Sequence, residues 1–125
     1  MPAGSARPLR LPRDRRIKYG RDFARIRSQG RRLIHGCMIV NWQELPGDQP
    51  SRVGVVTNRK LGGAVIRTRA RRLLREVFRL HQRTLRRPVD MVLVARASVV
   101  GKKLAQVEQD FITVLKRANL IGEAV

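Results

Sequence analysis

The segment Arg67-Thr-Arg-Ala-Arg-Arg-Leu-Leu-Arg-Glu76 places five arginines within ten residues. On a helix, at about 100° per residue, arginines fill one half of the circumference and apolar side chains fill the other half. This pattern predicts an amphipathic helix from about residue 64 to residue 84, with one side in a core and a guanidinium surface outside. The arginines are Arg67, Arg69, Arg71, Arg72, Arg75, Arg79 and Arg83, and the apolar side chains are Ile66, Ala70, Leu73, Leu74, Val77 and Leu80.

The chain as a whole is also strongly basic, as a cationic binding surface would require. Lysine and arginine number 28 against 9 acidic residues, which gives a formal net charge of +19. Such an imbalance destabilises a compact fold by self-repulsion unless a polyanion lies against it. A solvated helix usually interleaves both signs, whereas this one contains a single acid, Glu76. Arginine outnumbers lysine and suits bidentate contacts with phosphate, so the sequence predicts a nucleic-acid backbone as the partner.

Length and composition exclude several classes of protein. The chain has 125 residues and 42% hydrophobic residues, which suits one globular domain and argues against wholesale disorder. Cys37 is the single cysteine, so no intramolecular disulfide can form, and we expect a reducing cytoplasm. No apolar run approaches the roughly 20 residues that span a bilayer, so we expect no membrane association.

Local patterns divide the chain into an arm, a domain and a tail. Residues 1–15 contain three prolines and several arginines and are expected to form a basic, extended arm; residues 16–120 form the domain and 121–125 a tail. Within the domain we expect helices at 20–29, 64–84 and 102–118, and strands at 37–44, 53–57 and 89–95. The strand at 53–57 is expected to be the hairpin partner of 37–44, and the near-continuous apolar run 89–95 is expected to be a buried central strand.

No group of residues in the sequence predicts a catalytic centre on the protein. His35 and His81 are far apart in the chain, and His81 lies at the edge of the apolar side of the arginine-rich helix, where a packed histidine is expected. One cysteine and scattered acids form no metal-binding pattern, and Cys37 is expected in the core.

The acidic residues of the helices are expected to serve structure and solubility. Glu76 has Arg72 and Arg79 as neighbours one turn away, so an ion pair within the helix is expected. Glu108 and Asp110 are expected on the solvent side of the last helix.

The basic surface is expected to begin before the arginine-rich helix. Gly62-Gly63 lacks the spacing of a phosphate-binding loop and is expected to form a tight turn. Arg59 and Lys60 directly precede that turn and extend the cationic surface.

The central segment resembles the signature of the bacterial ribonuclease P protein family. The resemblance lies in Arg52-Val-Gly-Val-Val-Thr-Asn-Arg-Lys-Leu-Gly-Gly-Ala-Val-Ile-Arg-Thr-Arg-Ala-Arg-Arg-Leu-Leu-Arg-Glu-Val-Phe78. Asp90-Met-Val-Leu-Val-Ala-Arg96 is similar to the last strand of the family, and Asp22-Phe23 followed by Gly30 is similar to its first helix and turn. Thr68 and Gly63 stand where the family usually has Asn, and Arg71 stands where it usually has Lys.

This resemblance implies a fold. The family is an α+β, single-domain α/β sandwich of the ribosomal protein S5 domain 2-like type. It has a mainly antiparallel four-stranded sheet, a left-handed βαβ crossover and helices packed on the sheet. Spacing alone would favour a right-handed crossover, which is the general rule.

The resemblance also implies a function. The family is the protein subunit of ribonuclease P, in which a catalytic RNA removes the 5′ leader from precursor tRNA using Mg²⁺ bound mainly by the RNA. No residue of the protein is then catalytic or a metal ligand, and DNA is not a partner. By similarity, the catalytic RNA is expected on Arg59, Lys60, Arg67, Arg69, Arg71, Arg72 and Arg75, and the leader in a cleft with Phe23, Arg27 and Trp42.

Two other functions fit the composition. A structural ribosomal RNA-binding protein shares the size and the basic helix, and only the motif at residues 52–78 favours ribonuclease P over it. A sequence-specific DNA-binding regulator could also carry such a helix, but the segments upstream predict strands where a helix-turn-helix would need a helix.

Overall fold

The computed structural model describes residues 11, 15–18 and 20–122. Most of the predicted arm, residues 1–10 and 12–14, and most of the predicted tail, residues 123–125, lie outside the described residues. The elements in chain order are α1 (Gly20–Gln29), β1 (Arg31–His35), β2 (Met38–Glu44), β3 (Arg52–Val56), a 3-10 turn η3 (Arg59–Leu61), α2 (Ala64–His81), β4 (Val89–Ala95), a second 3-10 turn η4 (Ala97–Val99) and α3 (Leu104–Arg117).

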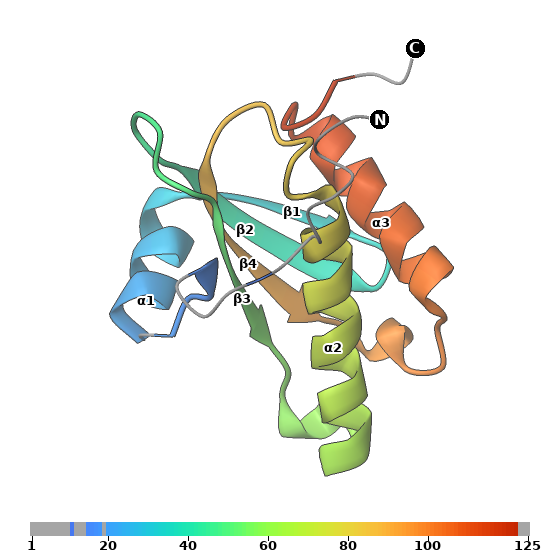
Figure 1. The fold of residues 1–125 in the computed structure, drawn as a ribbon. Coiled ribbons are helices and arrows are strands. Elements are labelled where there is room, and N and C mark those ends of the chain that lie inside the picture. The colour runs from blue at the N-terminus through green and yellow to red at the C-terminus, as the bar shows by residue number, and fades with distance from the viewer. Residues whose placement is uncertain (1–10, 12–14, 19, 123–125) are drawn as a thin grey trace.

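The four strands form one sheet in the order β1-β2-β4-β3. β1 pairs with β2 and β2 with β4 in antiparallel fashion, whereas β3 and β4 are parallel. The crossover from β3 through α2 to β4 is left-handed (Figure 1). The α+β class and the mainly antiparallel four-stranded sheet are thus confirmed.

One predicted strand pairing is wrong. β3 is not the hairpin partner of β2, because β4 lies between them and β2 forms its hairpin with β1. The physical reason is the apolar sequence of β4, which is stable only with a strand on each side and a layer on each face. All its residues except Val94 are buried, as expected for a central strand.

Helices cover both faces of the sheet. α2 packs over β3 and β4, α3 packs over β1 and β2, and the two helices contact each other on that face (Figure 1). The main core lies beneath them, and its largest buried side chains include Phe78, Phe111 and Leu74. α1 lies on the opposite face, over a smaller cluster built on Ile26 and Val92.

The centre of the buried side of α2 follows the predicted periodicity, while Leu73 and Leu80 are partly buried and Ile66 is an exception. Ala70, Leu74, Val77 and Phe78 are buried against the sheet and α3, and the helix ends at His81 rather than at residue 84. Ile66 was expected on the buried side, but 40% of its surface is exposed. It lies in the first turn of α2, against Gly62.

A buried carboxylate connects α1 to the sheet. Asp90, on β4, is completely buried and accepts hydrogen bonds from Arg52 on β3, at 2.8 Å to Nε and 2.6 Å to Nη2. Arg25, on α1, donates to the same carboxylate at 2.7 Å. The Arg25 guanidinium also contacts Asp22 and Gln43, so side chains from four elements meet here. The charge of Asp90 is therefore paired and hydrogen-bonded, as burial requires.

The pairing sets the protonation of Asp90. Burial by itself would raise the pKa of this carboxyl group, but the hydrogen bonds from Arg52 and Arg25 outweigh burial and hold the pKa below its ordinary value. Asp90 is therefore ionised at neutral pH.

We expect the substitution Asp90→Asn to destabilise the protein by about 2–4 kcal/mol, because it leaves two guanidinium groups without their buried anion. Denaturation with urea measures this cost. Glu44→Gln is the control, because Glu44 pairs with Arg87 in an exposed contact and its loss should cost about 0.5 kcal/mol or less. Equal costs for the two substitutions would contradict the role given to Asp90.

The lowered pKa of Asp90 also predicts a pH dependence. A carboxyl group whose pKa is lower in the folded state stabilises the fold above its unfolded pKa, and that stabilisation is lost as the pH falls through the folded pKa. We therefore expect the free energy difference between wild type and Asp90→Asn to be constant above about pH 5 and to shrink below about pH 4. A difference that stays constant down to about pH 2 would show that Asp90 does not carry this linkage.

Candidate nucleic-acid interface

The outer side of α2 carries a surface of unpaired positive charge. We call Arg67, Arg69, Arg71, Arg72 and Arg75 the arginine surface. Arg69 and Arg72 are exposed and the other three are half-buried. Among the described residues, no carboxylate lies within ion-pair distance of any of the five. Their charge is therefore available to an external anion.

Neutral oxygen atoms orient two of these arginines. Arg71 donates to the hydroxyl of Thr57, the residue after β3, at 2.9 Å, and to that of Thr68 at 3.2 Å. Arg69 donates to the backbone carbonyl of Lys102 at 2.7 Å. Such partners restrict the side chain without cancelling its charge, which prepares it to bind an anion.

Several positively charged side chains lie close together at the middle of α2. Burial, followed by the nearby charges of Arg16 and Arg71, lowers the pKa of Arg75 below its ordinary value. A hollow of about 400 Å³ opens at this place. Because like charges repel, an anion bound here would relieve the repulsion. The hollow is lined by Leu11, Arg16, Arg72, Arg75, Glu76 and Arg79.

The basic surface continues beyond the start of α2. Arg59 and Lys60 lie in η3 and are exposed, directly before the turn at Gly62. The backbone of Gly62 has a φ of 149°, which favours glycine, as the predicted tight turn requires. The N-terminus of α2 adds the positive end of its helix dipole to this region.

The acids near α2 are paired with basic side chains of the fold. Glu76 accepts two hydrogen bonds from Arg79, at 2.8 and 2.6 Å, so the predicted ion pair within the helix is confirmed with Arg79. The prediction that Glu108 and Asp110 merely face solvent is wrong. Glu108 contacts Nε2 of His81 at 2.8 Å, and Asp110 accepts a hydrogen bond from the backbone N–H of Cys37 at 3.0 Å.

Both acids of α3 therefore connect this helix to its neighbours. His81 is half-buried and packs its ring against Phe111, which agrees with the expected packed histidine. Cys37 is buried, as expected. Burial, with Asp110 nearby, raises the pKa of its thiol to about 12, so the thiol is protonated and unreactive.

Phe23 and Arg27 lie on the opposite side of the molecule, on α1. The half-buried ring of Phe23 lies over Gly54 of β3, where an added Cβ would approach the ring to 2.7 Å. Glycine at position 54 thus makes room for the aromatic ring. Arg27 is exposed in the last turn of the same helix. An aromatic edge and an exposed cation are therefore present on this side.

Trp42 does not lie on the α1 side of the sheet with Phe23 and Arg27. Only 4% of its surface is exposed, and it packs in the main core beneath α2 and α3. Successive side chains of a strand point to opposite faces, so Met38, Val40 and Trp42 share one face of β2 while Asn41 shares the face of α1. The expectation that Trp42 lines a cleft with Phe23 is wrong for this reason.

Comparison with known proteins identifies the family. The Ribonuclease P family model matches residues 11–119, which is most of the chain. The chain belongs to the ribonuclease P protein family.

Relatives of this ribonuclease P protein cover nearly its whole length. The ribonuclease P protein component of Syntrophomonas wolfei is 36% identical over 112 residues, which is 90% of this chain and 93% of the relative. That of Alkaliphilus oremlandii is 31% identical over 110 residues, 88% of this chain and 96% of the relative. The chain is therefore a protein component of the ribonucleoprotein endoribonuclease ribonuclease P, and its partner is RNA.

Solved structures agree in fold. The ribonuclease P protein of Staphylococcus aureus superposes with a TM-score of 0.77 at 28% identity, covering 86% of this chain and 98% of that one. The protein of Thermotoga maritima gives a TM-score of 0.73 at 28% identity, covering 82% and 96% of the two chains.

Two further observations concern what this ribonuclease P protein can bind. In the described part of the chain, no three side chains of His, Cys, Asp or Glu come together as a metal-binding group. None of the described helices is both long and apolar enough to cross a membrane.

Sequence reasoning missed several residues of these surfaces. Arg16 and Thr57 contribute to the arginine side, and Arg25 and Arg52 hold the α1 side in place. One signal was available: Asp90 is the single charge within an apolar strand, and a buried charge requires cationic partners. The identity of those partners depends on the tertiary structure.

Proposed function

We propose that the arginine surface, together with Arg59 and Lys60, docks on the catalytic RNA of ribonuclease P. One observation carries this proposal: five arginines project from one helix and none has a carboxylate partner among the described residues. From Arg67 to Arg75 the helix rises by about 12 Å, so five charges are concentrated over a short length. Phosphate groups of a folded RNA are the ligands that such a density of guanidinium groups fits.

The rigidity of α2 supports the same proposal. Its buried side packs on the sheet and on α3, so the arginine side chains project from a fixed backbone. A fixed array loses less conformational entropy on binding than a flexible basic tail would.

The α1 side of the sheet is proposed to hold the 5′ leader of precursor tRNA. Single-stranded RNA is commonly bound by an aromatic ring that stacks on a base and by cations that contact the backbone. Phe23 and Arg27 supply these two chemistries, and Trp42 does not take part. The two RNA surfaces then lie on opposite faces of the sheet.

Cleavage itself is assigned to the RNA. The residues described do not fit a protein-bound metal centre, so we assign the Mg²⁺ of the reaction to the RNA subunit and derive no step from it. The role of the protein is to bind the RNA subunit and the substrate. We further propose that it acts in the cytoplasm.

A reconstitution assay tests the function as a whole. Precursor tRNA is incubated with the ribonuclease P RNA of the same organism at low Mg²⁺, with and without the protein. The proposal expects 5′ cleavage to be stimulated by the protein and to be absent with protein alone. Cleavage by the isolated protein, or no stimulation at any Mg²⁺ concentration, would refute it.

The salt dependence of binding tests the docking surface. If five arginines each neutralise one phosphate, the affinity for the RNA subunit should fall with salt at a log-log slope of about −3.5 to −4.5. Replacing Arg71 and Arg72 by Ala should flatten the slope by about 1–2 units. Filter binding over a salt series measures this change.

The control for that series is the pair Arg86→Ala and Arg87→Ala, which removes the same charge beyond the other end of α2. Arg87 already pairs with Glu44, and Arg86 donates to Asn119. We expect the control to keep the wild-type slope. Equal flattening in both variants would mean that net charge, and not the arginine surface, sets the affinity.

The substitution Phe23→Leu tests the leader surface. Loss of one stacking ring should cost about 1–3 kcal/mol in affinity for precursor tRNA, measured on the holoenzyme. Binding of mature tRNA, which lacks the leader, should be unchanged. A similar loss for both RNAs would place Phe23 outside a leader contact.

A further inference from the structure

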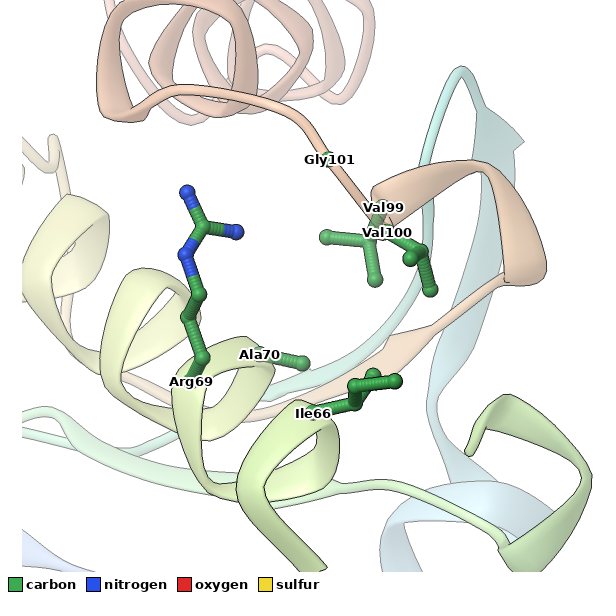
Figure 2. Close-up of a pocket in the computed structure, with 6 residues that line it drawn as sticks. All are labelled: Ile66, Arg69, Ala70, Val99, Val100 and Gly101. Carbon is green, nitrogen blue, oxygen red and sulfur yellow. The ribbon is translucent and has the colours of Figure 1, made fainter. Parts of the chain in front are cut away.

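An apolar pocket lies directly beside the arginine surface. Its volume is about 150 Å³, and it lies between the first turns of α2 and the end of η4 with the two residues that follow it. Figure 2 shows its lining residues around an open centre, with the Arg69 side chain along one side and Val99 and Val100 across from it. The lining residues are Ile66, Arg69, Ala70, Val99, Val100 and Gly101.

The apolar character of this place is unusual for the molecule. In the described part of the chain four large hydrophobic side chains are exposed; two of them, Ile66 and Val100, line this pocket, and a third, Val65, lies beside it on α2 without lining it. Val65 is 83% exposed, Val100 47% and Ile66 40%. Exposed apolar groups that gather at one place mark a binding surface more often than isolated ones do.

The surroundings of the pocket are cationic. Arg69 forms part of its wall and is held by the carbonyl of Lys102 at 2.7 Å. Lys102 and Lys103 follow Gly101 directly, and Arg72 lies one turn further along α2, beside a second hollow that Val65 and Arg69 share. A ligand of this pocket must therefore tolerate an apolar interior and a strongly positive rim.

We propose that the pocket takes one unstacked nucleobase of the RNA subunit. The inference rests on the proposed docking of that RNA on the arginine surface, and it adds a base contact to the phosphate contacts. An apolar cavity of about this volume is known to accept benzene, so the space suits a single six-membered ring. A nucleobase is flat and largely apolar on its faces, and it is attached to an anionic backbone that the cationic rim attracts.

Arg69 connects the two kinds of contact. Its guanidinium group lies at the edge of the pocket, where it can stack on a base or donate to an oxygen or nitrogen atom on the edge of the base. The bond to the Lys102 carbonyl fixes that position before the RNA arrives. A protein partner would have to match the same positive rim with acids, and continuity with the arginine surface favours the RNA instead.

A base contact and a phosphate contact differ in how their loss changes the salt dependence of binding. Insertion of a neutral base releases no counterions, so loss of this contact should weaken binding without changing its salt slope. We expect Ile66→Ala and Val100→Thr each to weaken binding of the RNA subunit about three- to tenfold, because each removes apolar contact with the base. Both positions are partly exposed, so the fold should tolerate the changes, and thermal unfolding of each variant verifies this.

Val65→Ala is the matched control. It removes aliphatic carbon from the neighbouring position of the same helix, but Val65 does not line this pocket. We expect its affinity to stay within about twofold of wild type. An equal loss in Val65→Ala would refute the pocket as the site of the contact.

The outcomes separate this inference from the proposed function. If Arg71→Ala with Arg72→Ala flattens the salt slope while both pocket variants bind as wild type, the docking surface stands and the nucleobase site is wrong. That result would also be expected if the pocket serves a protein partner. If the arginine variant keeps the wild-type slope, the proposed docking itself fails.

A direct readout uses RNA subunit transcribed with 4-thiouridine and irradiated in the complex. We expect crosslinked peptides that include residues 64–70 or 99–103. Crosslinks confined to other parts of the chain would overturn the proposal.

Discussion

The buried ion cluster at Asp90 is the interaction on which the arrangement of this molecule depends. A carboxylate with no exposure to water is stable only with cationic partners, and these come from α1 and from β3. The cluster therefore fixes α1 on one face of the sheet and holds β3 against β4, from which the crossover through α2 departs. Phe23 lies over Gly54 in the same region, so the position of the aromatic ring follows from the helix that Asp90 holds.

The few acids of the chain mostly form ion pairs with basic side chains of the same fold. Among the described residues, every acid except Asp48 lies within ion-pair distance of a basic side chain. Asp90 holds α1, Glu108 and Asp110 contact histidines of α2 and β1, and Glu76 pairs within α2. None of them reaches Arg67, Arg69, Arg71, Arg72 or Arg75. Five of the positive charges that the fold leaves without an ion pair therefore lie close together on the outer side of α2, where a protein component of ribonuclease P can meet RNA.

Sequence reasoning predicted those features that depend on neighbours along the chain. The periodicity of α2 predicted a buried side that includes Ala70, Leu74 and Val77, and an arginine side that faces outward. The apolar run at β4 predicted a central strand with bounds that the structure confirms. The errors in strand pairing and in the partners of side chains lie where distant segments meet. β3 was expected to pair with β2 because they are consecutive, and Trp42 was expected beside Phe23 although strand alternation places it on the other face. Glu108 and Asp110 were expected in solvent, because their partners lie on other elements.

By itself, the sequence determined that this chain carries a cationic helix on an apolar base and that it resembles ribonuclease P proteins. Charge, periodicity and a local motif suffice for that, since each is a property of residues close together in the chain. Only the tertiary structure decided which arginines have no carboxylate partner and which face of the sheet Phe23 covers. It also decided that Ile66 and Val100 line one pocket beside Arg69. These features depend on distances between segments far apart in the chain. Those distances are set by the order of the strands in the sheet and by the ion pairs of the buried Asp90.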